Sequence, residues 1–182
     1  MNLTTDRLVL RQWRAADREP FAAMNADPVV MRHFPSVRTR AESDALIDTN
    51  EAAIAERGWG LWAVDADGEF AGFIGLQPLR PTLPFAPGVE IGWRLAARFH
   101  GHGYAIEGAR RVVTYAFETI GLPELVSFTT EGNTPSRRVM EKLGMTHDPA
   151  EDFDHPGVPA DWAGRRHVLY RLAAPASTPP AA

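Results

Sequence analysis

Apolar and polar residues alternate along several short stretches of the chain, which is the pattern of half-buried strands. The turn signal Asp65-Ala66-Asp67-Gly68 separates two of these stretches, so they predict a hairpin. The strands predicted in this way span residues 7–13, 59–64, 69–76, 88–95, 124–130 and 166–172.

Elsewhere apolar residues recur every three or four positions, which predicts amphipathic helices. Local signals mark their ends: Asp17 suits an N-cap, and Thr39 with Glu42 suits a capping box. Pro135 suits the first turn of a helix that Gly144 ends. The expected helices span residues 17–26, 30–34, 39–57, 104–120 and 134–143.

The order of elements is strand, helices, a meander of strands, helix, strand, helix, strand. It predicts an α/β layered fold with a mixed sheet. The length of 182 residues is enough for one domain with a core. We assign residues 1–173 to this single domain. Residues 174–182 contain only alanine, proline, serine and threonine, and we expect a disordered tail there.

Composition excludes several classes of function. The formal charge of −4 argues against a nucleic-acid partner. The sequence contains no cysteine, which excludes disulfides, thiolate nucleophiles and thiolate metal sites. No apolar run approaches the roughly 20 residues of a membrane span, and the N-terminus lacks the apolar region of a signal peptide. We therefore expect a cytoplasmic protein without a membrane partner.

The segment 98–103 reads Arg-x-x-Gly-x-Gly and joins a predicted strand to a predicted helix. Free N–H groups at a helix start bind anions, and glycines let a phosphate approach the backbone closely. A dinucleotide fingerprint would need a third glycine at Ile106, and a nucleoside-triphosphate loop would need Gly-Lys-Ser/Thr; neither is present. A glycine pair in an ordinary strand-to-helix turn is the alternative interpretation.

This loop resembles the acyl-CoA pyrophosphate loop of the GNAT superfamily of N-acetyltransferases. Residues 133–145 read Asn-x-x-Ser followed by Lys-Leu-Gly-Met, which is similar to the second CoA-contacting element of that superfamily. Residues 3–11 and the tetrapeptide Glu-Ile-Gly-Trp at 90–93 resemble the RimJ/RimL-type branch. The chain is therefore identified as a member of this superfamily, with the RimJ/RimL-type branch as the closest resemblance.

The resemblance implies a mixed, mostly antiparallel sheet that splays at the CoA site, with helices on both faces. It implies acetyl-CoA as co-substrate and no metal, although His100 and His102 could suggest one. The acceptor would be an amine-bearing small molecule or a peptide or protein N-terminus, and a homodimer is compatible with it. The residues implied to contact the cofactor are Trp93, Leu95, Arg98, Gly101, His102, Gly103, Tyr104, Ala105, Asn133 and Ser136.

Three residues are candidates for the chemistry. The family commonly uses a tyrosine on the helix after the asparagine to protonate the thiolate; this helix has none, and Ser136 is the candidate in its place. Glu90 is the best candidate base, three residues before Trp93. His155, within the acidic run 151–156, is the second candidate. Each has a purely structural alternative: a helix cap for Ser136, a cross-strand salt bridge for Glu90, and a solvated acidic loop for the run that contains His155.

Two further features allow more than one interpretation. Prolines at 78, 81, 84 and 87 suit a polyproline-II-like crossing or a stiff surface loop, and also a wall of the acceptor pocket or a subunit contact. Gly92 inside a strand suggests a bulge or close backbone approach, or a packing glycine.

The leading hypothesis is an acetyl-CoA-dependent N-acetyltransferase in which a primary amine attacks the thioester directly. The absent tyrosine keeps a non-catalytic acyl-CoA-binding module of the same fold as the alternative. A nucleotide-binding domain is disfavoured because both of its glycine motifs are missing.

Overall fold

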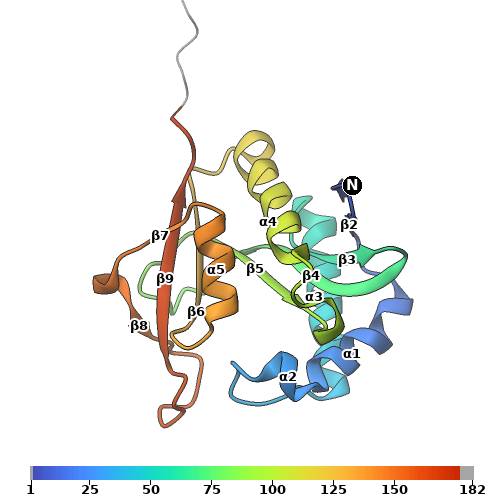
Figure 1. Cartoon of the computed structure of the whole chain (residues 1–182), viewed down its shortest axis with the longest axis horizontal. Coiled ribbons are helices and arrows are strands. Elements are labelled where there is room, and N and C mark those ends of the chain that lie inside the picture. The colour runs from blue at the N-terminus through green and yellow to red at the C-terminus, as the bar shows by residue number, and fades with distance from the viewer. Residues whose placement is uncertain (1, 177–182) are drawn as a thin grey trace, which may run out of the picture.

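The computed structural model describes residues 2–176, and Figure 1 shows the arrangement of their elements. Strands of the described chain form one sheet of nine in the order β1-β2-β3-β4-β5-β6-β9-β7, and β8 pairs with β9 beside this path. All pairs are antiparallel except β5 with β6. The strands are β1 (Leu3–Thr4), β2 (Leu8–Arg11), β3 (Leu61–Ala66), β4 (Glu69–Pro78), β5 (Val89–Leu95), β6 (Glu124–Thr130), β7 (Thr146–His147), β8 (Phe153–Asp154) and β9 (Arg166–Ala173).

Five α-helices accompany the described sheet. They are α1 (Arg18–Ala26), α2 (Pro28–Met31), α3 (Arg40–Arg57), α4 (Tyr104–Tyr115) and α5 (Thr134–Lys142), and α4 continues as a π-helical segment, Ala116–Ile120. The capping box of Thr39 and Glu42 is present at the start of α3. Gly144, with φ of 82°, follows the end of α5 as predicted. The predicted α/β fold with a mostly antiparallel sheet and helices on both faces is confirmed.

Alternate residues of β4 and β5 face opposite sides of the sheet. Ile74 on β4 lies under α4, because a Cβ at Gly108 of α4 would lie 2.5 Å from its side chain. Phe73 faces the other way and meets Phe21 of α1, with ring centroids 6.2 Å apart. We call these sides the α4 face and the α1 face. Through the cross-strand register, Trp93 belongs to the α4 face and Arg94 to the α1 face.

The sheet is interrupted between its two parallel strands. Strands β5 and β6 are in register only at Glu90 and Val126, near the start of β5. Farther along, the edge of β5 that faces β6 has no strand partner within residues 2–176. Its peptide groups are therefore available for a ligand, because backbone donors and acceptors require partners when they are enclosed. The splayed sheet implied by the family resemblance is present.

Some local predictions are wrong. Asp17 does not cap α1 with its side chain; its carboxylate accepts from Arg14 N–H at 2.8 Å instead. Phe34 lies after α2 rather than in a helix. Gly92 causes no bulge, because β4 and β5 pair in continuous register through it. Ala173, the last residue assigned to the domain, ends β9, and the predicted tail from 177 onward lies outside the described residues.

The proline-containing segment between β4 and β5 is a series of turns, since Leu83 N–H donates to Arg80 O and Ala86 N–H to Leu83 O. Polyproline II has no such internal bonds, so that interpretation is wrong. Leu79 and Leu83 are buried on a small second core. The other members of this core are Val126, Phe153 and Leu169. The segment thus packs over β6 and β9 on the α1 face.

A buried ion pair fixes the N-terminal strand. Arg11 donates to both carboxylate oxygens of Asp17, at 2.7 and 2.9 Å, and both side chains are almost inaccessible. Removing one partner of such a pair leaves an uncompensated buried charge.

We therefore expect Asp17→Asn to lower the free energy of unfolding by about 3 kcal/mol. Urea denaturation at neutral pH measures this change. The control is Asp48→Asn in an exposed pair with Arg18, where the Asp48 side chain is 64% exposed and little change is expected. Equal transition midpoints for the two variants would contradict the prediction.

Candidate active site

The loop before α4 presents backbone donors to solvent. Gly101 and Gly103 have φ of 81° and 82°, a region that L side chains rarely adopt. Gly103 is the N-cap of α4, and no side chain from the described residues caps this helix. The first helical backbone bond is donated by Glu107, to Gly103 O at 3.1 Å. The N–H groups of the first turn are thus free for an anion, as the sequence predicted.

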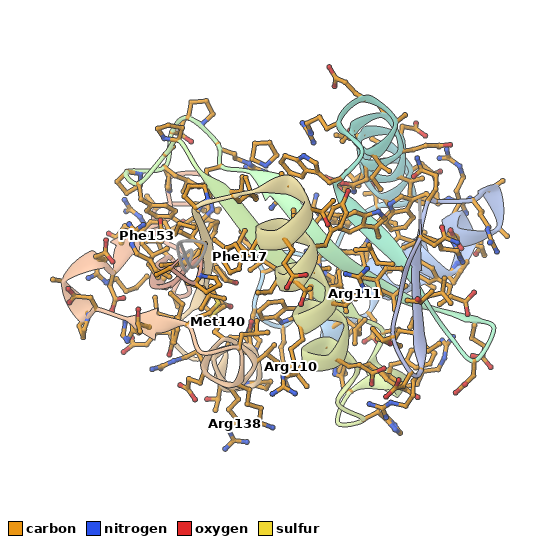
Figure 2. The ribbon with its side chains drawn as sticks, turned by 90° about the horizontal axis from the view of Figure 1, so that it is seen from above. Arg110, Arg111, Phe117, Arg138, Met140 and Phe153 are labelled. Atoms are coloured by element: carbon orange, nitrogen blue, oxygen red, sulfur yellow. The ribbon has the colours of Figure 1, made fainter. Side chains whose placement is uncertain are left out.

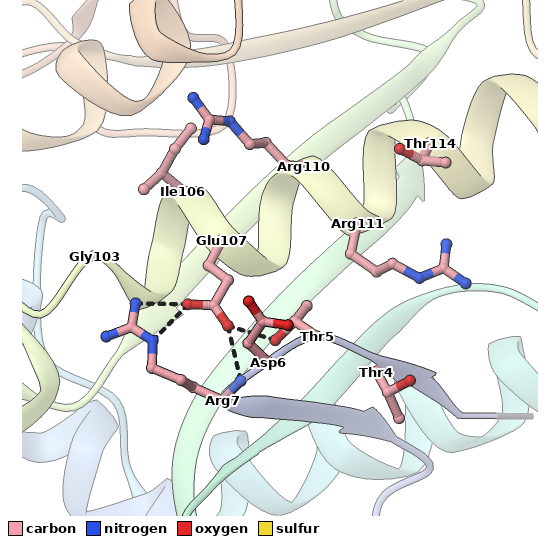
Figure 3. Close-up of a pocket in the computed structure, with 10 residues that line it drawn as sticks. All are labelled: Thr4, Thr5, Asp6, Arg7, Gly103, Ile106, Glu107, Arg110, Arg111 and Thr114. Atoms are coloured by element: carbon pink, nitrogen blue, oxygen red, sulfur yellow. Dashed lines mark hydrogen bonds and ion pairs between the residues drawn. The ribbon is translucent and has the colours of Figure 1, made fainter.

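The turn between β1 and β2, which contains Thr5 and Arg7, braces this loop, a contact that sequence reasoning missed. Arg7 Nε donates to Glu107 Oε2 at 2.7 Å (Figure 3). Arg7 Nη1 also donates to His102 O at 3.0 Å. Thr5 Oγ1 donates to Glu107 Oε1 at 2.6 Å. The Arg7 guanidinium also lies over the ring of Tyr104, 4.6 Å from its centroid. The resemblance of residues 3–11 to the family was the signal that could have indicated this role.

Other predicted loop residues make contacts within the protein. Arg98 pairs with Glu69 at 3.2 Å and lies over the Phe99 ring. His102 stacks on Tyr104, with 15° between the rings. These contacts hold the loop in shape, while its free backbone N–H groups remain the candidate anion-binding element.

The second predicted element begins α5. Asn133 is its N-cap: Oδ1 accepts from Ser136 N–H at 3.4 Å, and Nδ2 donates to Thr129 Oγ1 at 2.8 Å. Asn133 is therefore a helix cap, whatever else it binds. Ser136 is half-buried in the first turn. In the described chain its hydroxyl has no recorded hydrogen bond, which leaves it available to a ligand.

Helices α4 and α5 are neighbours on the α4 face. Arg110 Nη2 on α4 donates to Lys142 O on α5 at 3.4 Å. Figure 2 shows Arg110 and Arg138 projecting from the same side of the molecule. Trp93 of the interrupted strand lies on this face too, while Leu95 is buried and its carbonyl bonds to His100 Nε2 at 2.9 Å. The predicted cofactor residues thus border the α4 face and the end of β5.

Glu90 lies on the opposite, α1 face. Its carboxylate accepts from Gln77 Nε2 at 2.8 Å across the β4–β5 pair. Burial raises the pKa of Glu90 to about 7, against the opposing influence of Gln77 and Arg80. Glu90 forms no cross-strand salt bridge within residues 2–176, so the interpretation of Glu90 as a salt-bridge residue is wrong. A carboxyl group with this pKa exchanges protons at neutral pH.

His155 lies in an aromatic cluster beyond Glu90. Its ring centroid is 5.0 Å from that of His167 and 5.7 Å from that of Phe128. Burial, with the charges of His167 and Arg80, lowers the pKa of His155 to about 4. A base with this pKa is weak, so Glu90 is the better candidate. Arg80 acts on the pKa of both Glu90 and His155, which places the two candidates around one guanidinium.

The acidic run beside His155 is engaged in ion pairs. Glu151 accepts from Arg171 at 3.0 and 2.9 Å, and Asp152 lies 2.8 Å from His147 Nε2. Asp154 lies 3.7 Å from Arg165. These carboxylates secure the loop against β9 and β7 and are not free bases, so neither the catalytic nor the solvated interpretation describes them.

Comparison with known proteins decides the family. Residues 7–146 match the family described as an acetyltransferase (GNAT) domain. The chain belongs to the GNAT acetyltransferase family. Enzymes of this family use acetyl-CoA, so the predicted co-substrate is confirmed at the level of the family. The assignment to the RimJ/RimL-type branch remains a prediction.

One relative of this GNAT acetyltransferase is the FsC-acetyl coenzyme A-N(2)-transacetylase of Aspergillus fumigatus. It is 37% identical over 152 residues, which cover 80% of this chain and 65% of the relative. This chain therefore spans less than two thirds of the relative's length.

Solved structures show the same fold. An acetyltransferase of the GNAT family from Bacillus anthracis has a TM-score of 0.78 and 26% identity, over 95% of this chain and 98% of that one. The RimL ribosomal L7/L12 alpha-N-protein acetyltransferase in complex with coenzyme A has a TM-score of 0.76, over 96% and 98% of the two chains. Its identity of 15% shows the fold alone.

This GNAT acetyltransferase also has a pocket of about 370 Å³ on the α1 face, at the end of β6. Thr130 and His33 line it, with Thr130 Oγ1 3.5 Å from His33 Nδ1. Trp162 comes from the loop before β9, and Arg166 is the first residue of β9. Sequence reasoning missed His33, because nothing along the chain shows that the turn after α2 meets the end of β6.

No helix within residues 2–176 is both long and apolar enough to cross a membrane. No group of three or more histidine, aspartate and glutamate side chains gathers there as a metal would require. His100 is instead bonded to Leu95 O.

Proposed function

We propose that this protein is an acetyl-CoA-dependent N-acetyltransferase that acetylates a primary amine by direct attack. The observation that carries the proposal is the position of the break between β5 and β6. A phosphate-binding loop lies at the far end of β5, on the side of α4. A carboxyl group with a near-neutral pKa, Glu90, lies on the other face of the same strand. Cofactor and acceptor would thus meet at the break from opposite faces.

The residues present fit the CoA moiety. Uncapped N–H groups at α4 suit its pyrophosphate, and the unpaired edge of β5 suits the amides of its pantetheine arm. In the reaction, the amine nitrogen forms a bond to the acetyl carbon and the carbon–sulfur bond breaks. Glu90 would accept the proton that leaves the nitrogen, directly or through a water. Ser136 would donate a hydrogen bond to the departing thiolate.

We infer the acceptor class from the same geometry: an amine-bearing small molecule, or the N-terminus of a peptide or protein. Placement in the RimJ/RimL-type branch, a cytoplasmic location and a homodimer belong to this proposal. The placement in this branch is supported by residues 3–11, since Arg7 in this segment braces the loop before α4.

Thiol release from acetyl-CoA tests the proposal, measured against a panel of amines and N-terminal peptides. Turnover that depends on the amine supports it. Binding of CoA without turnover on any amine would favour the non-catalytic acyl-CoA-binding alternative, which the absence of a tyrosine from α5 motivates.

Ser136→Ala should lower kcat by about tenfold, less than the roughly 100-fold or more that is typical of general acid catalysis, because a thiolate is a weak base. The KM for acetyl-CoA should change less. Ser136 offers only its backbone N–H to Asn133, so the variant keeps the cap. The matched control is Ser127→Ala, a buried serine on β6. Steady-state kinetics with saturating amine measure both; an unchanged kcat for Ser136→Ala would reduce this residue to a structural one.

A further inference from the structure

Arg94 is a cation without a counter-ion on the acceptor side of the sheet. It lies on β5, on the same face as Glu90 and Gly92. Its guanidinium packs over the Phe34 ring, 4.3 Å from the centroid, and Nη1 donates to Asn25 Oδ1 at 2.8 Å. Its Nε is buried without a partner. In the described part of the chain no carboxylate lies within 4.0 Å of Arg94.

A second arginine increases the positive charge. Arg38 is close enough for its charge, together with burial, to lower the pKa of Arg94 to about 10. The Nε of Arg38 is likewise buried and unpartnered. The acid that Arg38 influences is Glu42, whose carboxylate is already bonded to Thr39 N–H at 2.7 Å. Arg38 thus lies within electrostatic range of Arg94, and among the described residues neither guanidinium has a carboxylate within 4.0 Å.

Asn25 holds Arg94 in position before any ligand binds. Asn25 is fully buried; it accepts from Arg94, its carbonyl accepts from Arg38 N–H at 3.0 Å, and its Nδ2 donates to Ser43 Oγ at 3.1 Å. Burying an unpaired charge is unfavourable by several kcal/mol. Arg94 is thus held rigidly although its burial is unfavourable for folding. A ligand that supplies the missing negative charge best explains why it is there.

The space beside Arg94 is open toward Glu90. A Cβ at Gly92 would meet no atom of the described chain within 4 Å except Glu90 Oε1, at 3.8 Å. Glu90 and Arg94 are four residues apart on one face, about 13 Å between their Cα atoms. One face of β5 therefore presents a carboxyl group, an open position and a cation in a row, a length that one small molecule can span.

We propose that the acceptor is a small amine that also carries a carboxylate, with Arg94 and Arg38 binding the carboxylate while the amine lies toward Glu90. This inference rests on the proposed acetyl transfer and narrows its substrate class. The planar guanidinium of Arg94 would bind the carboxylate through its Nη groups, because its Nε is enclosed by the protein. Phe34, 38% exposed, would contact the aliphatic part of the acceptor.

Matched pairs of amines test the proposal: β-alanine, γ-aminobutyrate and leucine, each against its own amide. For at least one pair, we expect the carboxylate form to have a kcat/KM about 10- to 100-fold higher, the range for charge-assisted hydrogen bonds. Arg94→Met should abolish this preference by raising the KM of the carboxylate form alone. The control is Arg57→Met, because Arg57 is also stacked on an aromatic ring, that of Trp59, but lies at the end of α3.

Equal kcat/KM values within every pair, or a preference that survives Arg94→Met, would overturn the proposal. If Arg94→Met unfolds, Arg38→Met, which keeps the bond from Arg94 to Asn25, must reduce the preference. If no amine is acetylated, the proposed function fails for this panel. Calorimetry with the CoA-bound protein then tests the anion site without relying on turnover. Heat of binding for the carboxylate forms that is lost in the arginine variant supports the anion site, and no binding rejects it.

Discussion

Gly103→Val is expected to weaken acetyl-CoA binding by about 100-fold or more, the equivalent of losing one or two charge-assisted hydrogen bonds. Gly103 has φ of 82° and directly precedes the free N–H groups of α4. A β-branched residue is strained there, so the backbone that must face the pyrophosphate would rotate away. A Cβ at this position would itself meet only Arg7 Nη2 within the described residues, at 3.5 Å, so the core is not overpacked. Isothermal titration with CoA measures the loss.

A matched variant distinguishes the effect of backbone strain on stability from the loss of the contact between the loop backbone and CoA. Gly121 has φ of 77°, ends the continuation of α4, and has open space around its Cβ position. Gly121→Val therefore introduces comparable strain on the same helix, far from the phosphate loop. We expect it to lower thermal stability about as much as Gly103→Val does and to bind CoA normally. Equal CoA affinities in the two variants would remove the loop from the cofactor site.

Much of the fold was predictable because its signals are local. The hairpin of β3 and β4 follows from an Asp-Gly turn, in which Gly68 N–H donates to Asp65 Oδ1 at 2.8 Å. The start of α3 follows from its capping box. The short strands β7 and β8 were missed because two residues carry no periodicity; both depend on β9 to form.

The candidate site was predictable on its cofactor side and less so on its acceptor side. A glycine loop and an Asn-x-x-Ser turn are contiguous motifs, so the sequence contains both. The environment of Glu90 depends on Gln77 and Arg80, which come from a different strand and a loop. The arginine pair joins β5 to the segment after α2 through Asn25. No spacing along the chain encodes such contacts, because tertiary packing alone brings these residues together.

The pH dependence of turnover is the remaining prediction with a large effect. Glu90 accepts a proton only when ionised, and burial raises its pKa to about 7 although Gln77 donates to it and Arg80 lies nearby. The rate should therefore rise with pH through about 7 and level off above it. Glu90→Gln keeps the size of the side chain but cannot accept the proton. We expect kcat to fall by about 100-fold or more, with loss of the rising limb.

Two variants test whether that limb belongs to Glu90. His155→Asn should keep it, because a histidine with a pKa of about 4 is already neutral at pH 6 and does not change its charge near pH 7. Asp154→Asn, in the paired acidic run, should keep it as well. A limb that survives Glu90→Gln and disappears in His155→Asn would transfer the role to the histidine.

The pH dependence of stability tests the raised pKa of Glu90 without depending on turnover. Since the pKa of Glu90 is raised in the folded state, its burial favours the protonated form. The associated stability is present at acidic pH and is lost as pH rises through about 7. Glu90→Gln removes a charge that the fold tolerates poorly, so the variant should unfold at higher urea concentration than the parent at pH 8, with little difference at pH 4. A carboxyl group kept at such a position despite this cost is what a proton acceptor requires, and equal urea midpoints for variant and parent at pH 8 would show that the pKa of Glu90 is not raised.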